Sequence, residues 1–469
     1  MVNSKIITLI KTFSQKELLA FESFVVSPFF NKNEALVKVF EIIKKEYPEF
    51  NSERFSKQKV FKTLYPDKVF DDKQIRYLLS ALLKLGYKFL MVRKIEEEAH
   101  EADLLLLDEF IERNLEKHYV QTRNRISVDL DNDLEIGLEH FYEKMKIADL
   151  EQKHFSRQQL RQFDDNIQHG SDFLNRYFVL KKLKYACGML DRQSLLKGAY
   201  QLDLPENWMD WLIANHYWGE KIIKMYAMVF LSLENEGEPA YFEKLKELLD
   251  AEISGISKDD SKELLLYAIN YCARKMRKGE DQYIETALHF YVKGIREKIL
   301  MENGFLSPWT FGNVVKLALR LERYEWIEHF IEEHKYHLVP EFQENAMQYN
   351  LAELYCYKKD FDKALSLLFK VEFSDLSYHL GSRIMLSKIY YELNEKEALL
   401  SLMSSFVMFL KRNKKISESI RKTCLNFCDL LFLIIRGKVQ QIEEKIKNTT
   451  LLADREWLLE KAATALKNA

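Results

Sequence analysis

The amino-acid sequence predicts an all-α protein built from stacked antiparallel helix pairs. Turn residues are scarce, since the 469 residues include only 14 Gly and 7 Pro, below the usual shares of about 7% and 5%. Hydrophobic residues make up 47% and charged residues 30%, a composition that permits a large core and argues against disorder. An apolar pattern in the C-terminal half also repeats at a nearly constant interval. Because β architectures need many turn residues, these observations together favour helices.

The charge distribution predicts three segments. The net charge of −2 excludes strong nonspecific attraction between the whole chain and nucleic acid. Residues 1–95, however, contain 18 Lys and Arg against 10 Asp and Glu, whereas the remainder contains 52 against 62. We therefore expect a basic N-terminal helical module over 1–95. Divergent helix pairs should follow over 96–258, and regular repeats with a C-terminal capping helix over 259–469.

The cysteines and the apolar runs predict a cytoplasmic protein with no membrane contact. The first 15 residues lack an apolar run followed by a small-residue cleavage site. The longest apolar run, around Leu430–Ile435, is far shorter than the roughly 20 residues that span a bilayer. The cysteines are odd in number and lie in apolar helical surroundings, as buried reduced thiols do; they are Cys187, Cys272, Cys356, Cys424 and Cys428.

Local signals define the helices of the basic module. Ser14 and Glu17 have the spacing of a capping box, which begins a helix that runs to Val25. That helix ends at Ser27, because the residue before a proline is disfavoured in helical conformation. Further helices are expected over 33–46, from 56 to just before 66, and after Asp72. The last of these is the longest, with apolar residues at spacings of three and four.

The long helix also carries candidate phosphate contacts. Four cations fall near one face, opposite the leucines: Lys73, Arg76, Lys84 and Lys88. Two features argue against a DNA-reading helix-turn-helix: the preceding turn is longer than three or four residues, and acidic side chains stand at the helix N-terminus. The face is therefore either a solvated surface or a nucleic-acid contact.

The middle segment shows helical spacing with poorly matched repeats. Helices are expected over 104–114, 134–150, 173–190 and 222–233, with breaks that include one near His169-Gly170. Three indoles lie close together, at Trp208, Trp211 and Trp218. They are interpreted as inter-helix core, with an exposed aromatic anchor for a peptide as the alternative.

The clearest repeat unit is Tyr349–Val371, which predicts two short helices joined by a turn at Lys359-Asp360. Equivalent apolar positions occur at Val314, Leu351 and Leu386, which are 37 and 35 residues apart. A helix pair of this kind cannot bury its apolar face alone, so it requires stacked neighbours.

The order of large and small apolar residues in this unit resembles the tetratricopeptide repeat, a helix-turn-helix unit of about 34 residues. The resemblance covers 345–372 best and extends more weakly to 305–335 and 380–410. Lys359 stands where that family prefers glycine. The resemblance implies a right-handed superhelix whose concave groove is lined by the first helix of each pair.

The resemblance implies that eight residues face this groove. They are Asn313, Lys316 and Arg320 from one repeat, Asn350, Glu353 and Tyr357 from the next, and Lys388 and Tyr391 from the third. A groove of this composition would hold an extended peptide or a helix. Asn amides would hydrogen-bond its backbone, and the cations would pair with its carboxylates.

The motifs favour binding over catalysis. The sequence has no Gly-rich phosphate loop, no H-E-x-x-H and no G-x-S-x-G. His334 and His337 have helical spacing but are interpreted as a polar helix end. We expect no cofactor, no metal and no enzymatic activity. The sequence predicts a scaffold that binds a protein or peptide, with a transcriptional or nucleic-acid-associated regulator as the alternative and an enzyme using middle-segment carboxylates as a weaker one.

Overall fold

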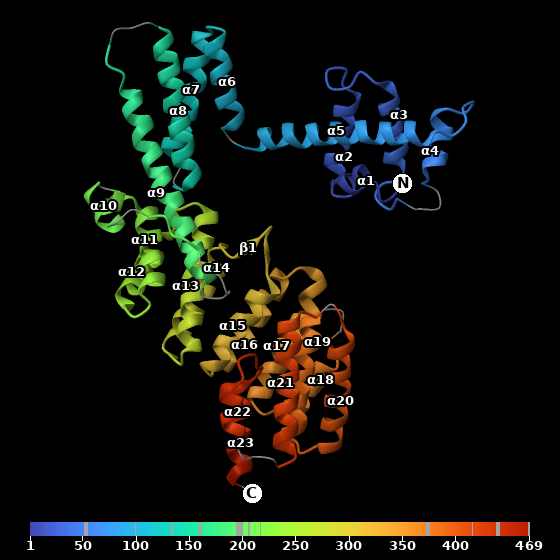
Figure 1. Cartoon of the computed structure of the whole chain (residues 1–469), viewed down its shortest axis with the longest axis vertical. Coiled ribbons are helices and arrows are strands. Elements are labelled where there is room, and N and C mark those ends of the chain that lie inside the picture. The colour runs from blue at the N-terminus through green and yellow to red at the C-terminus, as the bar shows by residue number, and fades with distance from the viewer. Residues whose placement is uncertain are drawn as a thin grey trace. The chain divides into compact units, whose positions relative to one another are not determined.

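The computed structural model confirms the all-α class (Figure 1). It describes residues 1–50, 55–98, 100–132, 135–158, 162–193, 200–204, 207–215, 217–371, 376–414, 416–437 and 441–467. These residues form 23 α-helices, short 3-10 turns and one two-stranded sheet. They divide into unit 1, which is Met1–Leu134 with Leu138–Phe178, and unit 2, which is Glu135–Gly137 with Val179–Ala469.

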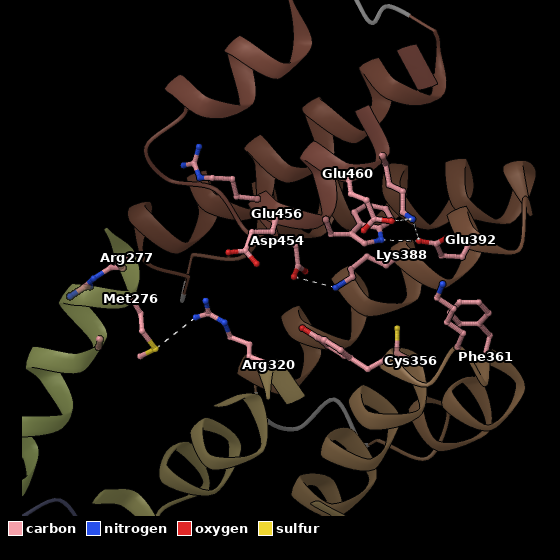
Figure 2. Close-up of a pocket in the computed structure, with 16 residues that line it drawn as sticks. Met276, Arg277, Arg320, Cys356, Phe361, Lys388, Glu392, Asp454, Glu456 and Glu460 are labelled. Atoms are coloured by element: carbon pink, nitrogen blue, oxygen red, sulfur yellow. Dashed lines mark hydrogen bonds and ion pairs between the residues drawn. The ribbon is translucent and has the colours of Figure 1, made fainter. Parts of the chain in front are cut away.

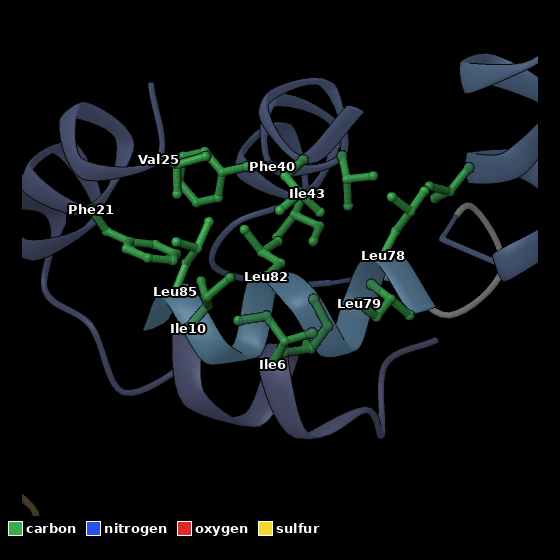
Figure 3. Close-up of a cluster of buried hydrophobic side chains, with 14 of the residues drawn as sticks. Ile6, Ile10, Phe21, Val25, Phe40, Ile43, Leu78, Leu79, Leu82 and Leu85 are labelled. Atoms are coloured by element: carbon green, nitrogen blue, oxygen red, sulfur yellow. The ribbon is translucent and has the colours of Figure 1, made fainter. Parts of the chain in front are cut away.

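The first part of unit 1 consists of five helices around one core. They are α1 (Lys5–Ile10), α2 (Gln15–Val26), α3 (Glu34–Lys45), α4 (Lys57–Leu64) and α5 (Asp72–Glu97). The side chains of α5 at spacings of three and four contact all four other helices. Figure 3 shows Leu78, Leu82 and Leu85 of α5 packed against Phe21, Phe40 and Ile6. Most of these bounds were predicted, but α1 is only six residues long and was missed.

The predicted capping box is confirmed. The Ser14 side chain accepts a hydrogen bond from the Glu17 backbone N–H, and the Glu17 carboxylate accepts one from the Ser14 backbone N–H. Glu17 also forms an ion pair with Arg93, which links the start of α2 to the last turns of α5.

The second part of unit 1 is a cluster of long helices. It contains α6 (Glu101–Glu112), α7 (Glu116–Asn132), α8 (Leu138–Arg157) and the first half of α9 (Asp165–Gln193). The predicted break at His169-Gly170 is wrong, because α9 runs through it. A methyl group on Gly170 would lie 3.5 Å from Asp149 Oδ1 and 3.7 Å from Ala148 Cβ, both of α8. The sequence also did not predict α7, whose buried residues are only Tyr119, Ile126 and Leu130.

Unit 2 consists of consecutive helix pairs. After the second half of α9 come α10 (Trp208–Ala214), α11 (Lys221–Glu234), α12 (Pro239–Glu252), α13 (Lys258–Arg277), α14 (Tyr283–Arg296), β1 (Met301–Glu302), β2 (Phe305–Leu306), α15 (Pro308–Arg320), α16 (Tyr324–His334), α17 (Pro340–Tyr357), α18 (Phe361–Leu368), α19 (Leu376–Glu392), α20 (Lys396–Arg412), α21 (Glu418–Ile435), α22 (Ile442–Asn448) and α23 (Arg455–Lys467). Helices from α11 to α20 contact each other as successive pairs, and α17 also contacts the first helices of the flanking pairs, α15 and α19. The right-handed superhelix stays a prediction.

Three turns in unit 2 share one backbone geometry. Glu322, Lys359 and Asn394 follow α15, α17 and α19, and their φ angles are 55°, 59° and 60°. In each turn the next residue donates its N–H to a carbonyl five residues earlier, at 2.9–3.0 Å. This left-handed ending is typical of helix C-termini. The three residues are 37 and 35 residues apart, which is the interval of the apolar repeat.

The predicted segment boundaries differ from the compact units. Position 95 lies in the last turns of α5, and position 258 is the first residue of α13. The division between the two compact units falls within α9, between Phe178 and Val179, and the three predicted segments stay a prediction. Of the clustered indoles, Trp208 is buried, and it stacks on the more exposed Trp211 with ring centroids 5.3 Å apart.

Candidate binding groove

Two cavities lie along the side of unit 2 lined by α15 and α17. Each has a volume of about 780 Å³. Cavity A is lined by the β-hairpin, α15 and α17, together with parts of α13 and α19. Cavity B is lined by the ends of α13, α15 and α17 and by residues of α19 and α23 (Figure 2).

Six of the eight predicted groove residues line these cavities. Asn313, Lys316 and Asn350 line cavity A. Arg320, Tyr357 and Lys388 line cavity B. Glu353 and Tyr391 line neither cavity. The helical spacing of the sequence therefore brings six of the eight residues to a hollowed surface, while their role in binding stays a prediction.

The apolar wall of cavity A comes from residues that the sequence analysis missed. Trp309, in the first turn of α15, has 68% of its surface exposed. Phe305 of β2 and Leu266 of α13 are also exposed beside the cavity. The β-hairpin turns at Asn303-Gly304, where both φ angles are positive. An Asn-Gly pair between apolar residues is the strongest short hairpin signal, so this sequence feature could have located the wall.

The floor of cavity A contains an unpartnered hydrogen-bond acceptor. Asn350 is only 1% exposed, and its Nδ2 donates to the Ala346 carbonyl oxygen at 2.7 Å. Its Oδ1 has no hydrogen-bond partner among the described residues. A methyl group on Gly312 of α15 would lie 3.7 Å from this oxygen. Because buried acceptors are nearly always paired, Oδ1 leaves a hydrogen-bonding capacity unused at this position.

The charged groups near the floor of cavity A differ in whether they have a partner among the described residues. Lys316 is exposed and forms no ion pair with a described residue, whereas Lys262, on the same cavity, pairs with Glu302. The Glu353 Oε2 is shielded from solvent and also lacks a partner among the described residues. Burial raises the pKa of the Glu353 carboxyl, and the ammonium groups of Lys316 and Lys388 lower it only in part.

The capping helix α23 contacts one end of the predicted groove. Lys388 Nζ lies 3.2 Å from Asp454 Oδ1, just before α23 (Figure 2). Glu392 accepts a hydrogen bond from Trp457 Nε1 at 2.9 Å and pairs with Lys461 at 2.7 Å. The rings of Tyr391 and Trp457 meet edge to face at 5.4 Å.

These contacts differ from the expectation that α19 lines an open groove. The resemblance implied that Lys388 and Tyr391 face an open groove, but both contact the α23 segment. Arg320 is likewise engaged, since it pairs with Asp281 at 2.7 Å. In cavity A, by contrast, the Asn350 Oδ1 has no described hydrogen-bond partner and Lys316 has no described ion-pair partner.

A second candidate surface lies on α5 in unit 1. All four predicted phosphate contacts are exposed, and Arg76 pairs with Asp72 at 2.8 Å. Lys73, Lys84 and Lys88 form no ion pair with a described residue. Tyr77 and Tyr87, which are 70% and 55% exposed, alternate with these lysines along the helix. We call Lys73, Tyr77, Lys84, Tyr87 and Lys88 the Lys-Tyr face.

The described part of the chain contains no group of three or more His, Cys, Asp and Glu side chains placed to hold a metal ion. The two histidines of the predicted polar helix end lie with Nδ1 atoms 3.2 Å apart. Within the same residues, no helix is long and apolar enough to cross a membrane.

Together these features define an all-α protein of stacked helix pairs with a hollowed, partly polar surface. No family model, no curated protein and no solved structure matches the chain.

Proposed function

We propose that the chain is a non-catalytic interaction protein that binds an extended segment of another protein along cavities A and B. The observation that carries this proposal is the Asn350 Oδ1, a buried acceptor without a described partner at the floor of a cavity with an exposed indole at its edge. An extended peptide supplies both N–H donors and apolar side chains, so it matches both features.

One buried polar network of unit 2 differs from the floor of cavity A in this respect. The Tyr226 hydroxyl donates to Asp260 Oδ1 at 2.7 Å and to Glu263 Oε2 at 2.9 Å. Lys184 pairs with the same two carboxylates. This network satisfies its own members and so contributes to packing, whereas the acceptors near cavity A leave hydrogen-bonding capacity for a partner.

The proposal places this binding in the cytoplasm. All five cysteines carry free thiols, and four of them are buried. Burial raises the pKa of the Cys272 and Cys428 thiols to about 12, so these groups stay protonated and unreactive at neutral pH. A reducing compartment fits this state.

Affinity capture with a matched variant tests the proposed function. The intact chain and a variant with Asn313→Ala, Lys316→Ala, Arg320→Ala and Asn350→Ala would be immobilised, and circular dichroism would confirm that both are folded. We expect one or more proteins to be retained from native lysate by the intact chain and lost from the variant. Identical retention by both proteins would contradict the proposal.

The Lys-Tyr face supports a second candidate function, the binding of single-stranded nucleic acid. Successive bases stack on exposed aromatic rings while cations contact the phosphates. Its three lysines are unpaired among the described residues, unlike Lys44, Lys57 and Arg93 of the same unit. This alternative would make the chain a nucleic-acid-associated regulator.

Fluorescence anisotropy of a labelled oligonucleotide with the full chain tests the second candidate. Binding should weaken steeply between about 50 and 200 mM salt. A Lys73→Ala, Lys84→Ala, Lys88→Ala variant should lose it. The control variant Lys32→Ala, Lys38→Ala, Lys45→Ala removes the same charge from exposed positions on or beside α3. Equal losses in both variants, or no binding at low salt, would count against the Lys-Tyr face.

A further inference from the structure

We propose that cavity A selects a segment in which a large apolar side chain stands next to an acidic residue. The apolar side chain packs against Trp309 and Phe305, a backbone N–H donates to Asn350 Oδ1, and the carboxylate pairs with Lys316. This inference rests on the proposed function and names the class of partner that its groove accepts.

The apolar wall of cavity A is the reason that the partner segment needs a large apolar side chain. Within the short stretch from β2 to α15, Leu306 and Phe311 point into the core, whereas Phe305 and Trp309 are exposed beside the cavity. Pro308 at the first helical position and the Ser307 cap hold this stretch in place. A large indole held on a rigid element at the edge of a cavity is typical of a binding hot spot. A bulky aliphatic or aromatic side chain is its complement.

The buried amide fixes the second requirement. The Asn350 Nδ2 donates one of its two N–H groups to the Ala346 carbonyl oxygen, whereas the Oδ1 has no described partner, and an amide oxygen accepts but cannot donate. A segment in extended conformation presents a backbone N–H on each side at every second residue. One such N–H can reach the floor while the neighbouring side chain packs against the wall.

The charge balance fixes the third requirement. Lys262 is neutralised by Glu302. Lys316 lines cavity A without an ion-pair partner among the described residues, and its ammonium group also interacts electrostatically with the buried Glu353 carboxyl. A carboxylate next to the apolar anchor forms a charge-assisted hydrogen bond with this ammonium group. A basic residue at the same place is repelled, so the pocket discriminates by charge as well as by shape.

A peptide-binding measurement with the full chain tests these three requirements. The probes are labelled synthetic nonapeptides with a central Phe or Leu and with Asp, Ser or Lys on both sides of it, followed by fluorescence anisotropy. We expect the Asp-flanked peptides to bind at least about tenfold more tightly than the Lys-flanked ones. Lys316→Glu should reverse this order.

Two variants separate binding from folding. Asn350→Leu keeps the branched shape and the number of side-chain heavy atoms and removes an unpaired buried acceptor, and Gly312→Ala adds a methyl group beside Oδ1 while favouring the helix. Both should weaken peptide binding about tenfold or more without lowering the melting temperature.

Trp309→Ala should weaken binding similarly. Tyr336→Ala removes an equally exposed aromatic side chain that lines neither cavity, and it should leave binding unchanged.

The outcomes distinguish this inference from the proposed function. If the peptides bind but only Tyr357→Ala or Arg320→Ala weakens them, cavity B holds the segment; the inference is then wrong and the proposed function stands. Equal affinity for Asp- and Lys-flanked peptides would also overturn the inference alone. A change of oligomeric state in Asn350→Leu would show that cavity A is covered by a second copy of the chain. If no peptide binds and affinity capture returns no partner that the variant loses, both the inference and the proposed function are wrong.

Discussion

Glu17 joins two interactions at one carboxylate in unit 1. It accepts the Ser14 backbone N–H as part of the capping box, and it pairs with Arg93. The hydrogen bonds from Ser14 and then from Arg93 lower the pKa of Glu17 from 4.5 to about 2. Since the folded-state pKa is depressed, the ionised form stabilises the fold above about pH 4.5, and this contribution is lost as the pH falls toward about 2.

Glu17→Gln should therefore destabilise unit 1 by about 1 kcal/mol at pH 7. The difference from the unsubstituted chain should shrink as the pH approaches about 2, because protonated Glu17 resembles Gln. Urea unfolding at several pH values measures both effects. Glu41→Gln, at an exposed position of α3, removes the same charge and should change little. A difference that is constant with pH would contradict the assigned role.

The contribution of Glu353 to stability has the opposite dependence on pH. Its folded-state pKa is raised above 4.5 by burial. The folded chain therefore holds the proton more tightly than the unfolded chain, and stability falls as the pH rises from about 4.5 through the folded-state pKa. Glu353→Gln should match the unsubstituted chain near pH 4 and be more stable at pH 7. Glu341→Gln, exposed on the same helix, should show no such gain. Chemical unfolding at the two pH values would reveal either result.

At the scale of elements, strong local signals predicted helices well. The Ser14 capping box and the regular apolar spacing of α5 depend only on neighbours in the chain, and both are confirmed. The six-residue α1 and the sparsely apolar α7 carry weak signals, so sequence reasoning missed them. Gly170 looked like a break because glycine is unfavourable in helices, yet it lies within α9.

The candidate groove shows the same division between local and long-range information. The spacing of three and four along α15 and α17 predicted which side chains share a face, and five of those residues line the two cavities. The contact of Lys388 with Asp454, however, joins positions 66 residues apart. Helical periodicity in the sequence does not predict such a contact, because the contact depends on how α23 packs against α19.

The left-handed turns give a prediction for single elements. A left-handed conformation costs a non-glycine residue about 1–2 kcal/mol, so Lys359→Gly should stabilise unit 2 by about 1 kcal/mol. Lys358→Gly, one residue earlier with φ −69°, lies in right-handed helical geometry. It should destabilise by about 1 kcal/mol. Thermal unfolding of the two variants compares them directly, and a loss of stability in Lys359→Gly would refute the strain argument.

The capping helix α23 should depend on one buried side chain. Leu458 is completely buried between α23 and its neighbours, whereas Leu466 is exposed on the same helix. Leu458→Ala should cost about 2–5 kcal/mol, and Leu466→Ala should cost less than about 0.5 kcal/mol. Hydrogen exchange of α23 amides would show whether the helix opens selectively. Equal protection in both variants would argue against this packing.

At the scale of the whole molecule, the chain divides into two compact units. We expect two transitions in calorimetric unfolding, because compact units need not unfold together. Leu82→Ala in unit 1 should lower one transition by several degrees, and Phe427→Ala in unit 2 should lower the other. A single transition that both substitutions shift equally would show that the units unfold as one.

The turns at Glu322, Lys359 and Asn394 also bear on how such chains are recognised. The backbone geometry recurs at each turn, but three different side chains occupy it, and none is the glycine that repeat signatures emphasise. Substitution can therefore remove the sequence signature of a repeat at these positions, while the backbone dihedral angles of the turn are retained. Distant relatives of this protein are better sought by the spacing of left-handed helix endings than by the letters at those positions.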